Sequence, residues 1–68
     1  MGKVKLTLDR YLDGHKITRY RLSEDSGVRY PTIDRYYKNT VKSYDGYILA
    51  KICDALDCEI SDIIEYIK

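Results

Sequence analysis

The chain has little of what builds a metal site or a disulfide framework. Its 68 residues include two cysteines, Cys53 and Cys58, and one histidine, His15. A structural zinc site takes about four cysteine or histidine ligands, and small secreted domains are held by several cysteine pairs. We interpret both thiols as lying in apolar surroundings. We therefore expect no metal and no disulfide, and two reduced thiols that serve as small core residues.

Long apolar runs are also absent. No run approaches the ~18 apolar residues of a membrane span, and no signal-peptide-like segment follows Met1. The sequence has one proline and four glycines, and it contains no internal repeat and no low-complexity segment. Nothing in it therefore indicates a boundary between domains. We expect a single domain over residues 1–68 in the cytoplasm, near the lower size limit for folding without disulfides or metals.

The sequence has no pattern typical of catalysis. Carboxylates are frequent in the C-terminal half, and paired carboxylates can carry out acid–base chemistry. No activated nucleophile, metal triad or glycine-rich phosphate loop accompanies them, and a chain of this size rarely encloses a substrate cleft. We expect no enzymatic activity, no cofactor and no small-molecule ligand.

The charges are unevenly distributed although the net charge is only +1. Residues 1–42 contain ten Lys or Arg against five Asp or Glu, a balance of +5, and residues 43–68 contain two against six, a balance of −4. Such segregation is typical of a protein with one face for a polyanion. Chance alone can produce it in so short a chain, so it favours nucleic-acid binding without establishing it.

Apolar residues recur at helical spacing through most of the chain. They predict an all-α bundle of five helices near residues 7–15, 18–25, 30–37, 44–56 and 61–67. Residues 3–6 alternate between apolar and polar, which is a strand period, so we expect an extended segment there and leave open whether it forms a short β-strand. The candidate N-caps precede the helical runs: Thr7, Thr18, Ser43 and Ser61.

The segment SEDSGVRYPTIDRYYKN at residues 23–39 contains a break between two helices. Gly27 supplies the left-handed backbone that ends the first helix, and Pro31 suits the first turn of the second, where its missing N–H costs no hydrogen bond. Val28 should point inward, and Ile33 and Tyr36 should lie on the core side of the second helix. Two helices joined in this way form a helix-turn-helix, which we place at about residues 18–37.

Several segments occur in the order and near the spacing of a known family: Leu8 and Tyr11, IT at 17–18, Leu22, SGV at 26–28, Thr32 and Ile33, ILAKICDALDC at 48–58, and ISDII at 60–64. On these residues the chain resembles the lambda-repressor-like helix-turn-helix domains, the Cro and XRE-type transcriptional regulators. A still closer likeness is to very short members that begin with a strand-like segment. The resemblance implies a five-helix bundle that binds operator DNA as a two-fold dimer, with helix 30–37 in the major groove. It also implies a repressor in a prokaryotic cell or a phage-infected host.

The resemblance places base contacts at the start of the second helix of the motif, residues 30–37, and one turn further on. Arg29 and Arg35 can each donate two hydrogen bonds to guanine O6 and N7. Tyr30 offers a hydroxyl and a ring edge for a thymine methyl group, and Thr32 offers the same on a smaller scale or acts only as a cap. Pro31 stands at a family reading position and has no side-chain hydrogen bond to offer.

The expected phosphate contacts flank this helix. Arg19 lies in the first turn of the preceding helix, where a cation opposes the helix dipole unless a phosphate binds there. The alternative for Arg19 is an ordinary exposed arginine. The family places further phosphate contacts in the loop after helix 30–37. In this sequence they are Lys38, Asn39 and Lys42. Tyr44 follows, and its hydroxyl can reach a phosphate while its ring covers the edge of the core.

Two kinds of partner remain open. Double-stranded operator DNA is the first, and the rival is an antitoxin-like or inhibitory protein-interaction module, which the weak net charge and the unusual Tyr30–Pro31 pair favour. We expect a homodimer, because one small domain buries too little DNA surface for tight specific binding. Segment 3–6 should pair with its two-fold mate, unless it folds back on its own helices. The residues expected at the dimer contact are Val4, Leu6, Ile64, Tyr66 and Ile67.

Overall fold

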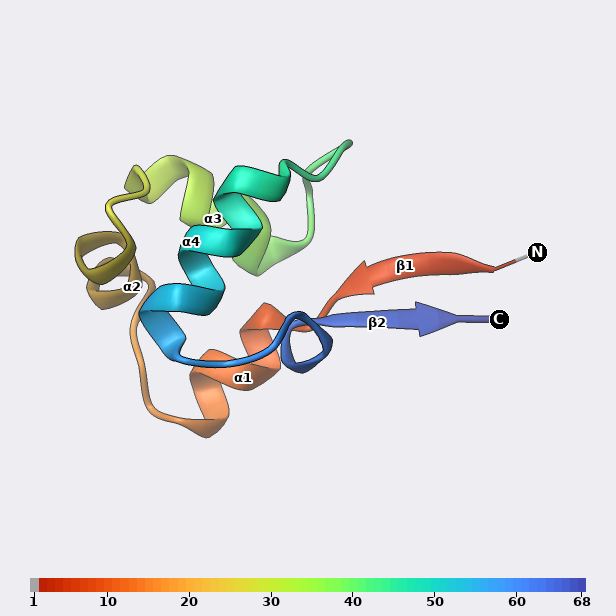
Figure 1. Cartoon of the computed structure of the whole chain (residues 1–68), viewed down its shortest axis with the longest axis horizontal. Coiled ribbons are helices and arrows are strands. Elements are labelled where there is room, and N and C mark those ends of the chain that lie inside the picture. Colours follow the sequence, from red (N-terminus) through yellow and green to blue (C-terminus); the bar gives the residue numbers. More distant parts are fainter. Residues whose placement is uncertain (1) are drawn as a thin grey trace.

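The computed structural model describes residues 2–68, in which four α-helices pack into a bundle and a two-stranded sheet extends from it (Figure 1). Within these residues, every helix is too short or too polar to cross a membrane. The first four predicted helices are confirmed, with ends within two residues of the prediction. In chain order the elements are β1 (Lys3–Leu6), α1 (Leu8–Gly14), α2 (Arg19–Ser26), α3 (Tyr30–Lys38), α4 (Gly46–Leu56), the 3₁₀-helix η1 (Ile60–Asp62) and β2 (Ile64–Ile67).

The predicted fifth helix at residues 61–67 is wrong, so the fold is not an all-α bundle of five helices. Only Ile60–Asp62 are helical, and Ile64–Ile67 form a strand antiparallel to Lys3–Leu6. Isoleucine, with its branched β-carbon, suits a strand. A single short helix is marginal in water, whereas β1 offers the last residues backbone hydrogen-bond partners along one edge. The strand at residues 3–6, which the sequence left open, is present.

The pairing of β1 with β2 places apolar side chains on one face of the sheet. Leu6 lies opposite Ile64, and Val4 lies opposite Tyr66. Leu6 is buried against the helices, whereas Val4 and Tyr66 are 45% and 63% exposed. Leu6, which was expected at a dimer contact, is therefore a core residue of its own chain, and β2 occupies one of the two edges of β1.

The core joins all four helices to the sheet. It includes one residue of β1, and α3 contributes two of its side chains. Tyr36 is buried, which confirms its expected place on the core side of α3. The buried apolar residues are Leu6, Leu8, Leu12, Leu22, Val28, Ile33, Tyr36, Ile52 and Ile63.

The turn between α2 and α3 is built as the sequence predicts. Thr18 caps α2 by accepting a backbone N–H of its first turn, and Gly27 ends α2 in the left-handed conformation with φ of 74°. Val28 is buried, and its carbonyl oxygen accepts a hydrogen bond from Ser23 Oγ at 2.6 Å. Pro31 lies in the first turn of α3. The turn is thus held at both ends, which fixes how α3 follows α2.

Of the other three candidate N-caps, Thr7 is confirmed in position but makes no capping hydrogen bond, and Ser43 and Ser61 are wrong. Thr7 stands at the N-cap position of α1, but its hydroxyl donates to the carbonyl of Asp62 instead of accepting from the helix. Asp45 rather than Ser43 caps α4. Ser61 lies inside η1.

The last segment offers a direct test of this packing. Ile63 is 0% exposed and Ile60 is 47% exposed. We expect Ile63→Ala to lower the free energy of unfolding by about 2–5 kcal/mol, because it removes buried methyl groups and leaves a cavity. The same substitution at Ile60 should cost under about 1 kcal/mol. Urea unfolding followed by circular dichroism measures both, and equal losses would contradict the observed packing.

Candidate nucleic-acid interface

Helix α3 turns one side to the core and the other to solvent. Ile33 and Tyr36 are buried and lie three residues apart, on one side of the helix. The rest of its surface can meet another molecule. The predicted base-contacting residues lie there and at the start of the helix, with Thr32 half-buried and the other three exposed: Arg29, Tyr30, Thr32 and Arg35.

The two arginines of this group keep their charge uncompensated. Within the described part of the chain, neither Arg29 nor Arg35 forms an ion pair. Arg29 is the N-cap residue of α3, and it is exposed to solvent at the point where the helix begins. Arg35 Nη2 lies 3.4 Å from the Thr32 hydroxyl, a long contact that is easily exchanged. Both guanidinium groups are therefore available to a guanine edge.

Arg19 is the first residue of α2, but it is not the ordinary exposed arginine of the alternative interpretation. Its guanidinium carbon lies 4.6 Å from the centroid of the Tyr37 ring, and its Nη1 pairs with Asp34. The hydroxyl of Tyr37 in turn donates to Asp13 Oδ1 at 2.9 Å. These contacts link α2 to α3 and α1, and they hold Arg19 beside α3.

Asp34 binds two of the predicted phosphate-contacting cations. Its Oδ2 lies 3.2 Å from Lys38 Nζ, one helical turn away, and its Oδ1 accepts from Arg19. The hydrogen bond from Lys38 is the main reason that the pKa of Asp34 is lowered, and the bond from Arg19 acts in the same direction. The carboxylate is thus charged at neutral pH and offsets part of both positive charges. The i,i+4 spacing of Asp34 and Lys38 was the sequence signal that could have revealed this pair.

Asn39 has a structural role that the sequence did not reveal. It ends α3 in the left-handed conformation, with φ of 58°, which asparagine tolerates better than most residues. Its Oδ1 accepts the backbone N–H of Leu6 at 3.2 Å. The end of α3 is thereby tied to β1, and the side-chain oxygen of Asn39 is engaged within the protein.

The loop after α3 carries the remaining predicted phosphate contacts. Lys42 forms no ion pair with any residue from 2 to 68. The Tyr44 hydroxyl donates to the Val4 carbonyl oxygen at 3.4 Å, and its ring centroid lies 6.5 Å from that of Tyr36. The Tyr44 ring therefore lies near the buried Tyr36 ring while the residue stays 38% exposed, and its hydroxyl reaches β1.

A groove of about 560 Å³ separates α3 from this loop. Its lining includes Thr32 and Arg35 of α3, Lys42 of the loop, and the acidic residue Asp45 at the N-cap of α4. The groove thus brings two predicted base-contacting residues together with one predicted phosphate-contacting residue.

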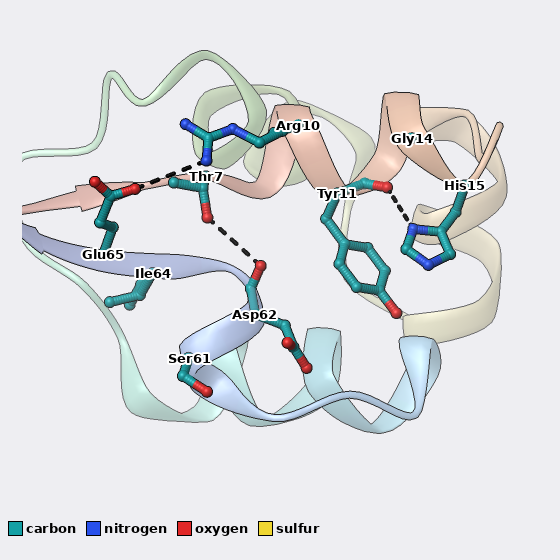
Figure 2. Close-up of a pocket in the computed structure, with 9 residues that line it drawn as sticks. All are labelled: Thr7, Arg10, Tyr11, Gly14, His15, Ser61, Asp62, Ile64 and Glu65. Atoms are coloured by element: carbon teal, nitrogen blue, oxygen red, sulfur yellow. Dashed lines mark hydrogen bonds and ion pairs between the residues drawn. The ribbon is translucent and has the colours of Figure 1, made fainter.

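A second hollow, of about 400 Å³, lies between α1 and the C-terminal segment (Figure 2). The His15 ring stacks on the Tyr11 ring, with centroids 4.1 Å apart, and its Nδ1 lies 2.8 Å from the Tyr11 carbonyl oxygen. Asp62 and Glu65 line the same hollow, and Glu65 lies 3.9 Å from Arg10. The lining of this hollow includes none of the predicted DNA-contacting residues, so it is not part of the candidate interface.

The two cysteines lie at the C-terminal end of α4 and just beyond it, half-buried and unbridged. Burial raises the pKa of both thiols, that of Cys58 to about 11. Both are therefore protonated at neutral pH. Across residues 2–68 no group of three or more His, Cys, Asp or Glu side chains is placed to hold a metal ion.

The family model of the Cro/C1-type HTH DNA-binding domain matches residues 7–68. The match spans nearly the whole chain, and the protein belongs to this family of helix-turn-helix DNA-binding domains. This confirms the resemblance drawn from the sequence. Neither the curated proteins nor the solved structures gave a significant match.

The structural role of Asn39 at the end of α3 can be tested on the protein without DNA. We expect Asn39→Ala to lower the free energy of unfolding by about 1–3 kcal/mol, because the partly buried N–H of Leu6 loses its acceptor and alanine tolerates the left-handed conformation less well than asparagine. Asn39→Asp keeps an acceptor at the same position and should cost less than half as much. Thermal and urea unfolding of the protein without DNA measure both variants. If alanine and aspartate cost the same, the bond to Leu6 does not stabilise the end of α3.

Proposed function

We propose that this protein is a sequence-specific transcriptional regulator that inserts α3 into the major groove of operator DNA. The observation that supports this most is the outward side of α3. Arg29 and Arg35 are exposed there without an ion pair among the described residues, and Tyr30 and Thr32 lie between them in sequence. The major groove admits a helix, and arginine pairs with guanine in it.

We propose further that the regulator is a repressor. Occupying an operator needs contacts to DNA alone, whereas activation also needs a contact with the transcription machinery. It would act by binding rather than by catalysis, without a cofactor, in the cytoplasm of a prokaryotic cell or a phage-infected host.

A homodimer completes the proposal. The sheet extends beyond the helices (Figure 1), and its apolar face continues past the buried Leu6 to the exposed Val4 and Tyr66. A second copy would cover these two side chains. The α3 helices of the two copies would then lie about 34 Å apart, which matches two half-sites whose centres are one DNA turn apart.

A protein-interaction module of the antitoxin or inhibitor kind is the second candidate. Tyr30 is exposed next to Pro31 at the start of α3, and such an aromatic surface also suits a protein partner. Asp34 favours the same alternative, because it offsets positive charge on this helix.

Base reading by α3 is tested by two truncations. We expect Arg29→Ala and Arg35→Ala each to cost about 1–3 kcal/mol of binding to the preferred site and to relax the preference at one base pair. The preferred site comes from selection of bound fragments out of random duplex DNA, and fluorescence anisotropy then gives the affinities. Arg10→Ala is the matched control, since Arg10 lies on α1 beside the hollow of Figure 2.

Circular dichroism must show that each variant is folded. If both variants keep full affinity and selectivity, α3 is not the reading element. If the wild-type protein selects no sequence and binds duplex DNA at no salt concentration, the protein-interaction module becomes the better account.

The dimer is tested by sedimentation of the protein without DNA at micromolar concentrations. We expect a dimer for the wild type and a monomer for Val4→Asp, because a charge on the exposed part of the apolar face would be desolvated at the contact. Tyr47→Ala, which removes an exposed aromatic side chain from α4, should leave the dimer intact. A monomeric wild type would contradict this contact and leave DNA binding by α3 untouched.

A further inference from the structure

We propose that Asp34 acts as an internal competitor for DNA phosphates and thereby lowers the affinity of the protein for DNA of any sequence. Its carboxylate takes the place of a phosphate on Arg19 and Lys38 when no DNA is bound. This inference rests on the proposed function of α3 and adds to it a residue with the opposite charge from the expected contacts.

The geometry places one carboxylate between two helices at the point where a phosphate is expected. Oδ1 of Asp34 faces Arg19 at the start of α2, and Oδ2 faces Lys38 in the last turn of α3. A helix N-terminus with an arginine on it attracts an anion. In the structure the anion that meets Arg19 is a side chain of the protein itself.

The two cations remain open to exchange. The side chains of Arg19 and Lys38 are 35% and 58% exposed, so a phosphate can approach both of them. The Asp34 side chain is itself 24% exposed, so water and an incoming phosphate can reach both ion pairs and replace the carboxylate. Stacking on Tyr37 keeps the Arg19 guanidinium in place while its partner changes.

The charge arithmetic gives the direction of the effect. Arg19, Lys38 and Asp34 together carry +1, whereas Arg19 and Lys38 alone would carry +2. Sequence-independent binding to DNA is essentially electrostatic and grows with the number of phosphates neutralised. Asp34 therefore weakens contacts that carry no sequence information, and within residues 2–68 it pairs with neither of the proposed reading side chains, Arg29 and Arg35.

The test is the salt dependence of binding to a labelled short duplex of arbitrary sequence. We expect Asp34→Asn to bind about three- to tenfold tighter than wild type at low salt, and the plot of log affinity against log salt to steepen by about 0.9, one additional phosphate. Asp34→Glu, which restores the charge, should return both values toward wild type. The matched control is Asp25→Asn, which removes the same charge from an Arg21 pair of 3.0 Å and should change the slope much less.

A double variant assigns the effect to the ion pairs. If the higher DNA affinity comes from freeing Arg19 and Lys38 of their ion pairs, the affinity should rise far less when Asp34→Asn is added to a protein that already carries Arg19→Gln and Lys38→Gln. Circular dichroism checks folding, and Asp34→Ser replaces Asp34→Asn if the asparagine variant does not fold.

The outcomes separate this inference from the proposed function. If wild type binds DNA but Asp34→Asn matches Asp25→Asn, the competitor role is wrong and the proposed function stands. If Asp34→Asn binds more weakly at an unchanged slope, Asp34 holds Arg19 in position for DNA, which also overturns the competitor role. If neither wild type nor Asp34→Asn binds DNA, the proposed function fails and this inference fails with it.

Discussion

Burial of Ile33 and Tyr36 fixes the rotation of α3 about its axis, and the remaining features of the candidate interface depend on it. Both side chains lie in a core built from nine residues, and Tyr36 also accepts the backbone N–H of Asp45 at the start of α4. With this side of α3 held inward, Arg35 and the residues at the helix start have only the solvent side left. The core of a small domain therefore determines which side chains can meet another molecule.

The sheet contributes to the same surface from the opposite end of α3. Asn39 ties the end of the helix to β1 through Leu6, and the Tyr44 hydroxyl reaches the carbonyl of Val4. The strand pair thus holds the end of α3 and the loop that carries Lys42. Asn39 and Tyr44 are both expected to contact phosphate. In the structure each of them also forms a hydrogen bond with the backbone of β1.

Much of this arrangement could be predicted from local sequence, because local rules govern it. Helical spacing gave the first four helices, and Gly27 with Pro31 gave the turn between α2 and α3. The fifth helix was wrong because Ile60, Ile63, Ile64 and Ile67 fit helical spacing, while the strand they enter depends on residues at the far end of the chain. The pairing of Arg19 with Asp34 spans fifteen positions and two helices, so no local spacing reveals it. The family match extends the sequence argument to DNA binding, but individual contacts depend on side-chain positions.

The proposed function requires that α3 reads base edges in the major groove. Guanine N7 lies in the major groove only, so methylation of this atom blocks a major-groove reader and spares a minor-groove one. The most direct measurement is methylation interference on the selected operator with the wild-type protein. The account predicts that N7 methylation blocks binding at two short tracts about one DNA turn apart, and that Arg29→Ala or Arg35→Ala removes the interference at one guanine in each tract. Binding that tolerates N7 methylation throughout the selected site would contradict it.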